Sequence, residues 1–159
     1  MEFAGKHVFV TGASRGIGLA TAKEFLARGA RVAVNGRTEQ SVATAITELG
    51  GGDRLVAAPG NIGTVDGCES AVRAAIGGLG GLDVLVNNAG VCIDSTIEGS
   101  DETIWDETLN INLKGTFPAL ARRSQRFAGM GVQLSIWPQW RGCRVRHKAR
   151  CMPRPRAVS

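Results

Sequence analysis

Residues 11–18 carry three glycines where the chain leaves an apolar run and has to begin a helix, and they read TGASRGIG. Glycine permits the positive φ of a tight turn and lets the backbone approach a bound group closely. The unpaired N–H groups and the dipole at the start of a helix favour an anion such as a pyrophosphate. An ordinary glycine-rich turn is the alternative, but the preceding run HVFV supplies the strand-to-helix context of a phosphate loop. The residues of this segment that are predicted to bind the ligand are Gly12, Ser14, Arg15, Gly16, Ile17 and Gly18.

A basic side chain stands where the second apolar run, RVAV, ends. Proteins that prefer NAD present an acidic residue to the ribose hydroxyls at this place, but residues 35–38 read NGRT and contain no acid. The guanidinium of Arg37 can bind a 2′-phosphate through two parallel hydrogen bonds. We therefore expect NADP(H) as the cofactor in preference to NAD(H), with a solvated surface charge as the alternative role of Arg37.

Four short apolar runs alternate with helical segments through the first part of the chain. HVFVT, RVAVN, RLVAA and DVLVN are nearly continuous, as expected of strands buried on both faces of a parallel sheet. Helices are predicted over residues 17–28, 40–49 and 65–76, and each of them runs out into glycine. The fold class that this alternation predicts is α/β, a doubly wound parallel sheet whose ligands lie beyond the carboxyl ends of the strands.

The regular pattern weakens after residue 100. Residues 101–126 are consistent with one long helix, a prediction that Gly115 and Pro118 weaken. VQLSIW is a candidate fifth strand, and the residues after it contain three prolines and follow neither a helical nor a strand period. We predict one domain over residues 1–127 and a basic, irregular tail over residues 128–159, so that the sheet is incomplete on its C-terminal side.

Two of these motifs resemble signatures of one known family. TGASRGIG, with the spacing TGxxxGxG, is similar to the glycine motif of the short-chain dehydrogenase/reductase family, and residues 87–90, NNAG, match its second signature. The resemblance covers roughly residues 5 to 120 and implies a Rossmann-type fold and an NADP(H)-dependent oxidoreductase. It further implies that Arg15 adds positive charge at the 2′-phosphate, and that Asn88, Ala89 and Gly90 line the adenosine side of the cofactor.

The resemblance also assigns residues after the third and fourth apolar runs. Asn61, followed by Ile62, stands where the family usually has an aspartate that reads the adenine edge. Its amide both donates and accepts hydrogen bonds, so contact with adenine stays open although the negative charge is absent. In WDETLNINL, Asn112 matches the family's catalytic asparagine, which is thought to hold a water of the proton relay by distorting the helix locally. A helix asparagine that caps a kink is the alternative.

The chain contains no tyrosine, although the resemblance implies a tyrosine as the acid and base of catalysis and a lysine that lowers its pKa. The family's YxxxK motif follows the asparagine by roughly forty residues. Ser135, His147 and Lys148 match no part of this pattern, and we assign catalysis to none of them. We therefore expect a family oxidoreductase for a small-molecule carbonyl or alcohol whose present chain is impaired. The alternative is a non-catalytic dinucleotide-binding or subunit-pairing module.

The charge distribution changes sharply along the chain. All 14 acidic residues lie within residues 1–107, whereas residues 108–159 carry 11 of the 19 basic residues. Together with the missing tyrosine, this change suggests that the reading frame is lost after the helix, and a natural truncation is the other explanation. The basic tail could also contact nucleic acid, but its residues follow no binding motif, and we expect no nucleic-acid partner.

Composition argues against several other classes of protein. The four cysteines form no CxxC pair, so we expect free thiols and no metal site. No apolar stretch approaches the roughly 20 residues that cross a bilayer, and the N-terminus lacks the pattern of a signal peptide. We therefore expect a cytoplasmic protein without membrane contact. The resemblance implies a homo-oligomer, an assembly that the sequence itself does not predict.

Overall fold

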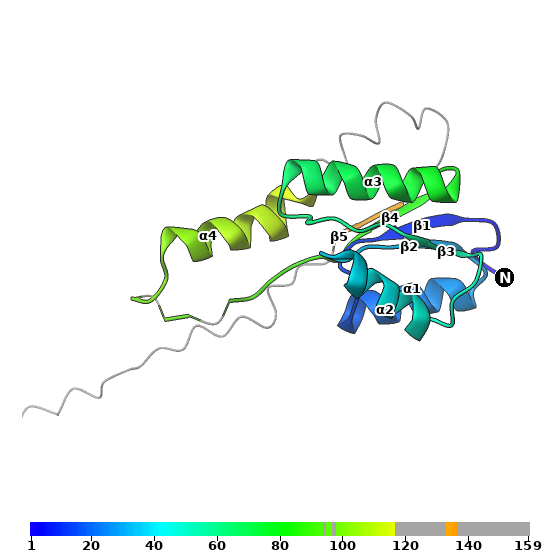
Figure 1. The fold of residues 1–159 in the computed structure, drawn as a ribbon, viewed down its shortest axis with the longest axis horizontal. Helices are drawn as coiled ribbons and strands as arrows, with labels where there is room; N and C mark the ends of the chain where they lie inside the picture. Colours follow the sequence, from blue (N-terminus) through cyan, green and yellow to red (C-terminus); the bar gives the residue numbers. More distant parts are fainter. Residues whose placement is uncertain (94, 97, 117–132, 137–159) are drawn as a thin grey trace, which may run out of the picture.

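In the computed structural model, which describes residues 1–93, 95, 96, 98–116 and 133–136, the chain forms a five-stranded parallel sheet in the order β3-β2-β1-β4-β5 (Figure 1). The strands are β1 (His7–Val10), β2 (Arg31–Val34), β3 (Leu55–Ala57), β4 (Val84–Asn87) and β5 (Gln133–Ile136). The strand order reverses between β1 and β4, which makes that place a topological switch point. The doubly wound, Rossmann-type sheet expected from the sequence is confirmed.

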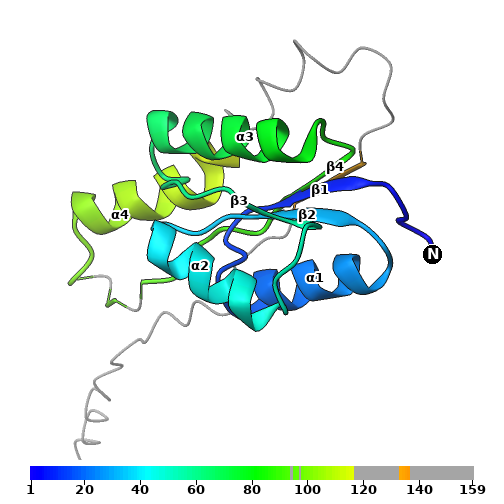
Figure 2. The same cartoon turned by 45° about the vertical axis from the view of Figure 1, so that its right-hand side comes forward.

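Helices cover the sheet on both faces, as Figure 2 shows. α1 (Gly16–Ala27) and α2 (Glu39–Glu48) lie on one face, and α3 (Val65–Leu79) lies on the other. Val8 and Val10 of β1 pack in the apolar cluster with α1 and α2, whereas Phe9 packs in the cluster with α3. Because β1 is buried on both faces, its sequence is a continuous apolar run instead of an alternating one.

Three of the described α-helices begin at a side chain that accepts a hydrogen bond from their first turn. Thr38 caps α2 in a capping box with Ser41, Thr64 caps α3, and Asp101 caps α4 (Glu102–Leu109). α1 begins at Arg15, which makes no such bond. The three helices predicted before residue 80 are confirmed, and their ends lie within three residues of the predicted positions.

The predicted long helix after residue 100 is not one continuous α-helix. α4 ends at Leu109, and a π-helix, η1 (Asn110–Lys114), follows it directly. The N–H of Gly115 donates to the carbonyl of Asn110 at 2.8 Å, a bond that spans five residues instead of four. The last part of that prediction, residues 117–126, lies outside the described residues.

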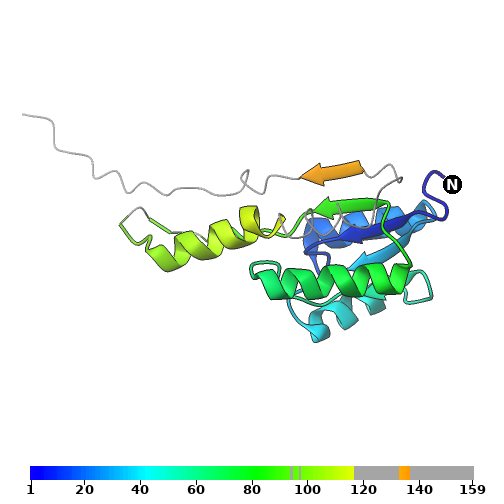
Figure 3. The same ribbon diagram turned by 90° about the horizontal axis from the view of Figure 1, so that it is seen from above.

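β5 lies at the edge of the sheet and pairs in parallel with β4 (Figure 3). The candidate fifth strand VQLSIW is thus confirmed over Gln133–Ile136. The predicted domain boundary at residue 127 and the tail beyond residue 136 lie outside the described residues, and the division into domains stays a prediction.

The expectation of four free thiols is wrong for Cys92. Cys68 keeps a buried thiol, whose Sγ lies 3.4 Å from the carbonyl oxygen of Gly115, but Cys92 is disulfide-bonded. Spacing along the sequence cannot reveal this bond, because a disulfide needs two cysteines that the fold brings within a few ångströms. Cys143 and Cys151 lie outside the described residues.

No helix of the described residues is both long and apolar enough to cross a membrane. α3 has 15 residues, and charged side chains such as Asp66, Glu69 and Arg73 are spread along it. The same part of the chain holds no group of three His, Cys, Asp or Glu side chains arranged for a metal ion.

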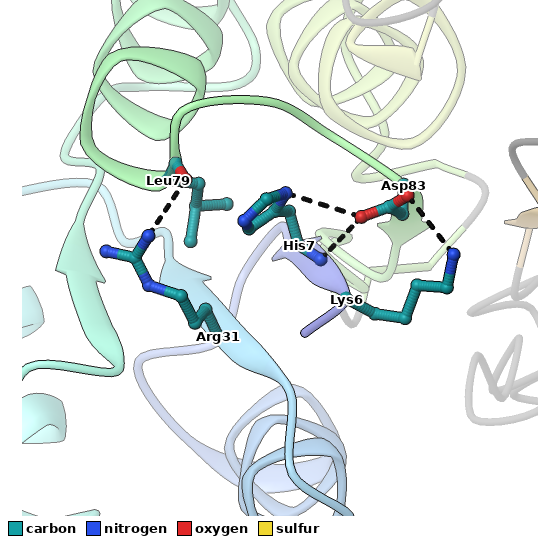
Figure 4. Close-up of polar contacts among 5 residues, drawn as sticks. All are labelled: Lys6, His7, Arg31, Leu79 and Asp83. Atoms are coloured by element: carbon teal, nitrogen blue, oxygen red, sulfur yellow. Dashed lines mark hydrogen bonds and ion pairs between the residues drawn. The ribbon is translucent and has the colours of Figure 1, made fainter. Parts of the chain in front are cut away.

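Polar contacts close the amino-terminal edge of the sheet, opposite the carboxyl ends of the strands (Figure 4). Asp83 accepts a hydrogen bond from the backbone N–H of His7 at 2.8 Å and lies 3.4 Å from its ring Nδ1. The Nζ of Lys6 lies 3.5 Å from the same carboxylate. Arg31 donates to the carbonyl of Leu79 at 3.0 Å and so satisfies the end of α3. These contacts fix the starts of β1, β2 and β4 relative to one another.

We expect Asp83→Ala to lower the free energy of unfolding by about 1.5–3 kcal/mol, because a charge-assisted hydrogen bond to the N–H of His7 is lost. Lys6→Ala is the matched control, since an exposed ion pair is worth about 0–1 kcal/mol. Urea denaturation followed by circular dichroism measures both losses. Equally small losses in the two variants would show that the Asp83 carboxylate does not fix the strand starts.

Candidate functional site

A cleft of about 270 Å³ opens at the carboxyl ends of β1, β2 and β4, the edge of the sheet beyond which α4 extends (Figure 1). Every residue that the sequence predicts to contact a cofactor lines this cleft: Gly12, Ser14, Arg15, Gly16, Ile17, Gly18, Arg37, Asn61, Ile62, Asn88, Ala89 and Gly90. Further lining residues that the prediction omits are Asn35, Gly36, Gly60, Val91 and Ile111. These distant segments meet because parallel strands end at the same edge of the sheet.

The glycines of the first turn are required by backbone conformation and by close packing. Gly12 and Gly16 have φ angles of 62° and 57°, which residues with side chains rarely adopt. A Cβ on Gly12 would lie 2.8 Å from the Cα of Ala89. A Cβ on Gly18 would overlap the carbonyl oxygen of Gly12 and the amide nitrogen of Asn88. The start of α1 is therefore in direct contact with the end of β4.

Hydrogen bonds between Thr11 and Asn88 join the ends of β1 and β4. The Nδ2 of Asn88 donates to the carbonyls of Thr11 at 3.0 Å and Gly12 at 3.2 Å. The Oγ1 of Thr11 accepts from the backbone N–H groups of Asn88 and Ala89, each at 3.0 Å, and donates to the carbonyl of Val86 at 3.3 Å. Both side chains are buried, so these bonds replace the hydration that the polar groups lose on folding.

Asn35 holds the loops after β1, β2 and β3 together. Its Oδ1 accepts from the N–H of Gly12 at 3.1 Å, and its Nδ2 donates to the carbonyls of Ala58 at 2.9 Å and Gly60 at 3.1 Å. The side chain is 1% exposed. From the sequence alone, residue 35 contributes only to the cofactor prediction, through the lack of an acidic side chain. Its bracing role depends on three loops that only the fold brings together.

The start of α1 carries a positive potential that no side chain of the helix neutralises. Arg15 makes no side-chain bond at the N-cap, and the first turn contains no acidic residue. The N–H groups of that turn and the helix dipole therefore favour an anion in the cleft. Arg15 and Arg37 both line the cleft, and none of its described lining residues is acidic. The cleft is chemically suited to phosphate groups.

Arg37 lies at the rim of the cleft, immediately after β2. Its Nη2 is 3.6 Å from the Oε1 of Glu107 on α4, and both side chains are largely exposed. The attraction between such groups is weak in water and is screened by salt. The guanidinium is therefore able to exchange this partner for another anion.

The turn before α3 places Asn61 and Ile62 in the cleft. The Oδ1 of Asn61 accepts from the N–H of Gly63 at 3.0 Å and closes the turn. Within the described residues, the Nδ2 of Asn61 makes no hydrogen bond, which leaves its donors available to a bound group. Ile62 is buried beside Gly115, where a Cβ would lie 2.6 Å from it. η1 therefore packs directly on this turn.

Asn112 lies in η1 and holds the loop that follows β4. Its Oδ1 accepts from the N–H of Val91 at 2.8 Å, and its Nδ2 donates to the carbonyl of the same residue at 2.8 Å. Asn112 is not among the described residues that line the cleft, although its neighbours Val91 and Ile111 are. The local helix distortion expected at this asparagine coincides with the π-helix, a feature frequently found at functional sites. Its catalytic role stays a prediction.

Adjacency in the sequence could have revealed some of the omitted lining residues. Gly36 and Gly60 are direct neighbours of predicted residues and lack side chains, so they leave room in a cleft. Val91 directly follows the predicted Gly90, so the same adjacency could have identified it. Ile111 directly precedes the predicted Asn112, but the sequence does not show that its side chain faces the cleft, because that orientation depends on the π-helix.

The reversal of strand order, the glycine loop after β1 and the cleft at the switch point define a Rossmann-type, nucleotide-binding α/β fold. A profile of the short chain dehydrogenase family matches residues 6–130. The chain belongs to this family.

Individual proteins of known sequence or structure are also similar to this chain. Glucose 1-dehydrogenase from Gluconobacter oxydans (strain 621H) is 42% identical over 117 residues, which are 72% of this chain and 44% of that protein. The structure of a blue fluorescent protein from a metagenomic library, in complex with NADPH, has a TM-score of 0.72 at 32% identity and covers 80% of this chain and 53% of its own. A 3-ketoacyl-(acyl-carrier-protein) reductase from Brucella melitensis, complexed with NADH, has a TM-score of 0.72 at 29% identity and covers 78% of this chain and 51% of its own. This chain spans about half the length of the relatives it matches.

We expect Gly18→Ala to lower the free energy of unfolding by about 1–3 kcal/mol, because the new methyl group overlaps the turn and the end of β4. Gly77→Ala within α3 is the control: a Cβ there has no heavy atom within 4 Å. It should raise stability by about 0.5–1 kcal/mol, since alanine favours a helix over glycine. Urea denaturation measures both. A Gly18→Ala variant as stable as the parent would contradict the close contact of α1 with β4.

Proposed function

We propose that this chain binds NADP(H) in the cleft at the ends of β1, β2 and β4, as an oxidoreductase of the short-chain dehydrogenase family. The observation that carries the proposal is the presence, in one cleft, of an uncapped helix N-terminus on α1 and a guanidinium, Arg37, at the end of β2. These are two separate positive regions. They correspond to the two phosphorylated parts of NADP(H), the diphosphate and the 2′-phosphate.

The first region suits a diphosphate. Among the described residues, no side chain accepts from the N–H groups at the start of α1, and Gly16 places no side chain between the backbone and a bound phosphate. The hydroxyl of Ser14 also lines this part of the cleft and can donate to a phosphate oxygen. The glycines and the donors thus fit the group that the family binds.

The second region favours NADP(H) over NAD(H). No acidic residue stands at the end of β2 to accept from ribose hydroxyls, and Arg37 offers a planar fork to a 2′-phosphate. Arg15 lines the same cleft and adds positive charge. Asn61, Ile62 and the turn that carries Asn88, Ala89 and Gly90 are the proposed adenosine contacts. The relatives of known structure hold NADPH in one case and NADH in another, so the preference rests on these arginines.

Bound NADP(H) would supply hydride transfer to or from a small-molecule carbonyl or alcohol. The part of this chain is to orient the dinucleotide, and Asn112 is the residue proposed to support a proton-relay water while it holds Val91 in place. The chain contains no tyrosine, so the group that would give or take the proton at the substrate oxygen is absent from it. We infer that this chain binds the cofactor and, as an impaired enzyme, turns over substrate slowly.

The absence of tyrosine also favours a second candidate function, a dinucleotide-binding module without catalysis that acts alone or beside a complete subunit. The two candidates differ in one readout. A panel of carbonyl substrates that oxidises NADPH above the background rate would favour the enzyme, and binding without any turnover would favour the module.

We expect NADPH titration, followed by its fluorescence, to show binding that is tighter than that of NADH. Arg37→Gln should weaken NADPH binding by about tenfold, because a charge-assisted contact to the 2′-phosphate is lost, and should leave NADH binding nearly unchanged. Arg73→Gln removes the same charge from an exposed position on α3 that is not among the lining residues, and serves as the control. A parent chain that binds neither nucleotide would overturn the proposal. Equal weakening of both nucleotides would overturn the role of Arg37.

A further inference from the structure

The ion pair between Arg37 and Glu107 crosses the rim of the cleft. Arg37 follows β2, whereas Glu107 lies near the end of α4, and the distance between Nη2 and Oε1 is 3.6 Å. Both side chains are exposed to solvent, at 61% for Arg37 and 45% for Glu107. Their contact therefore has to be broken, or at least shared, when an anion binds the same guanidinium.

Glu107 places an acid where the loop after β2 lacks one. In proteins that prefer NAD, a carboxylate at the end of β2 accepts from the ribose hydroxyls and repels a 2′-phosphate. Residues 35–38 of this chain, NGRT, contain no such group. The carboxylate of Glu107 reaches the same region from another element and lies against the residue that would bind the 2′-phosphate.

The position of Glu107 on its helix explains why this acid, and not its neighbour, reaches the cleft. Glu107 lies in the last turn of α4, before η1 begins at Asn110, and its carboxylate meets Arg37 at the rim of the cleft. Asp106 is exposed and precedes Glu107 by one residue, so it points to a different side of α4. The two acids thus carry the same charge near the cleft, but Glu107 is the one in contact with Arg37.

We propose that Glu107 is a specificity-determining residue, which competes with the 2′-phosphate of NADP(H) for Arg37 and so reduces the preference of the cleft for NADP(H) over NAD(H). This inference rests on the proposed function. Two effects act in the same direction: the carboxylate has to release the guanidinium, and it then repels the phosphate that replaces it. Both effects concern charges near solvent, so both decrease with added salt.

The direct test compares Glu107→Gln with the parent chain at low ionic strength. We expect the dissociation constant for NADPH to fall about three- to tenfold, and that for NADH to change less than about twofold. The fragments 2′,5′-ADP and 5′-AMP should show the same contrast, because they differ only in the 2′-phosphate. Asp106→Asn is the control for the loss of one negative charge on α4, and it should change the NADPH affinity less than Glu107→Gln does.

A double-mutant cycle distinguishes the direct contact between Glu107 and Arg37 from a long-range electrostatic effect of the Glu107 charge. In an Arg37→Gln background, Glu107→Gln should no longer improve NADPH binding, because the guanidinium for which the carboxylate and the 2′-phosphate compete is absent. An unchanged or weaker NADPH affinity in Glu107→Gln would overturn the inference while leaving the proposed function intact, as would an equal gain for NADH or for Asp106→Asn. A parent chain that binds neither nucleotide would overturn both.

Discussion

The contact between the glycine turn after β1 and the end of β4 is the constraint on which the rest of the structure depends. Gly18 has no room for a side chain against Gly12 and Asn88, and the hydrogen bonds of Thr11 with Asn88 hold the two strand ends at this separation. Because of this contact, the N-terminus of α1 opens into the switch point of the sheet instead of into solvent. The charge of the cleft depends on that placement, since the helix start has no acidic neighbour and no cap of its own.

A second constraint is the contact between η1 and the loop after β4. The π-helix adds a residue to one turn and so rotates Asn112 and its neighbours relative to α4. Asn112 then meets both backbone groups of Val91, and Ile111 reaches the cleft. α4 is thereby held beside the end of the cleft where Glu107 contacts Arg37. The proposed cofactor preference thus involves α4 as well as the loop after β2.

Patterns of a few adjacent residues, such as continuous apolar runs and glycine turns, are enough to predict the helices and strands and most of the candidate site. They place α1, α2 and α3 within three residues and identify lining residues at the end of each inner strand. They do not predict η1 or the hydrogen bonds of Asn112 and Asn35, which join segments that are distant in the sequence. The pairing of Arg37 with Glu107 is not predictable for the same reason: it joins two elements whose distance only the fold determines.

Nitrogen-15 NMR of the backbone amides during an NADPH titration tests whether the anionic parts of a dinucleotide bind at the start of α1. We expect the amide resonances of Gly16, Ile17 and Gly18 to shift with a common saturation curve. The amides of His7 and Asp83, at the opposite edge of the sheet, should stay in place. Shifts confined to that opposite edge, or no shift in residues 16–18 at saturating NADPH, would show that the dinucleotide does not bind at the start of α1.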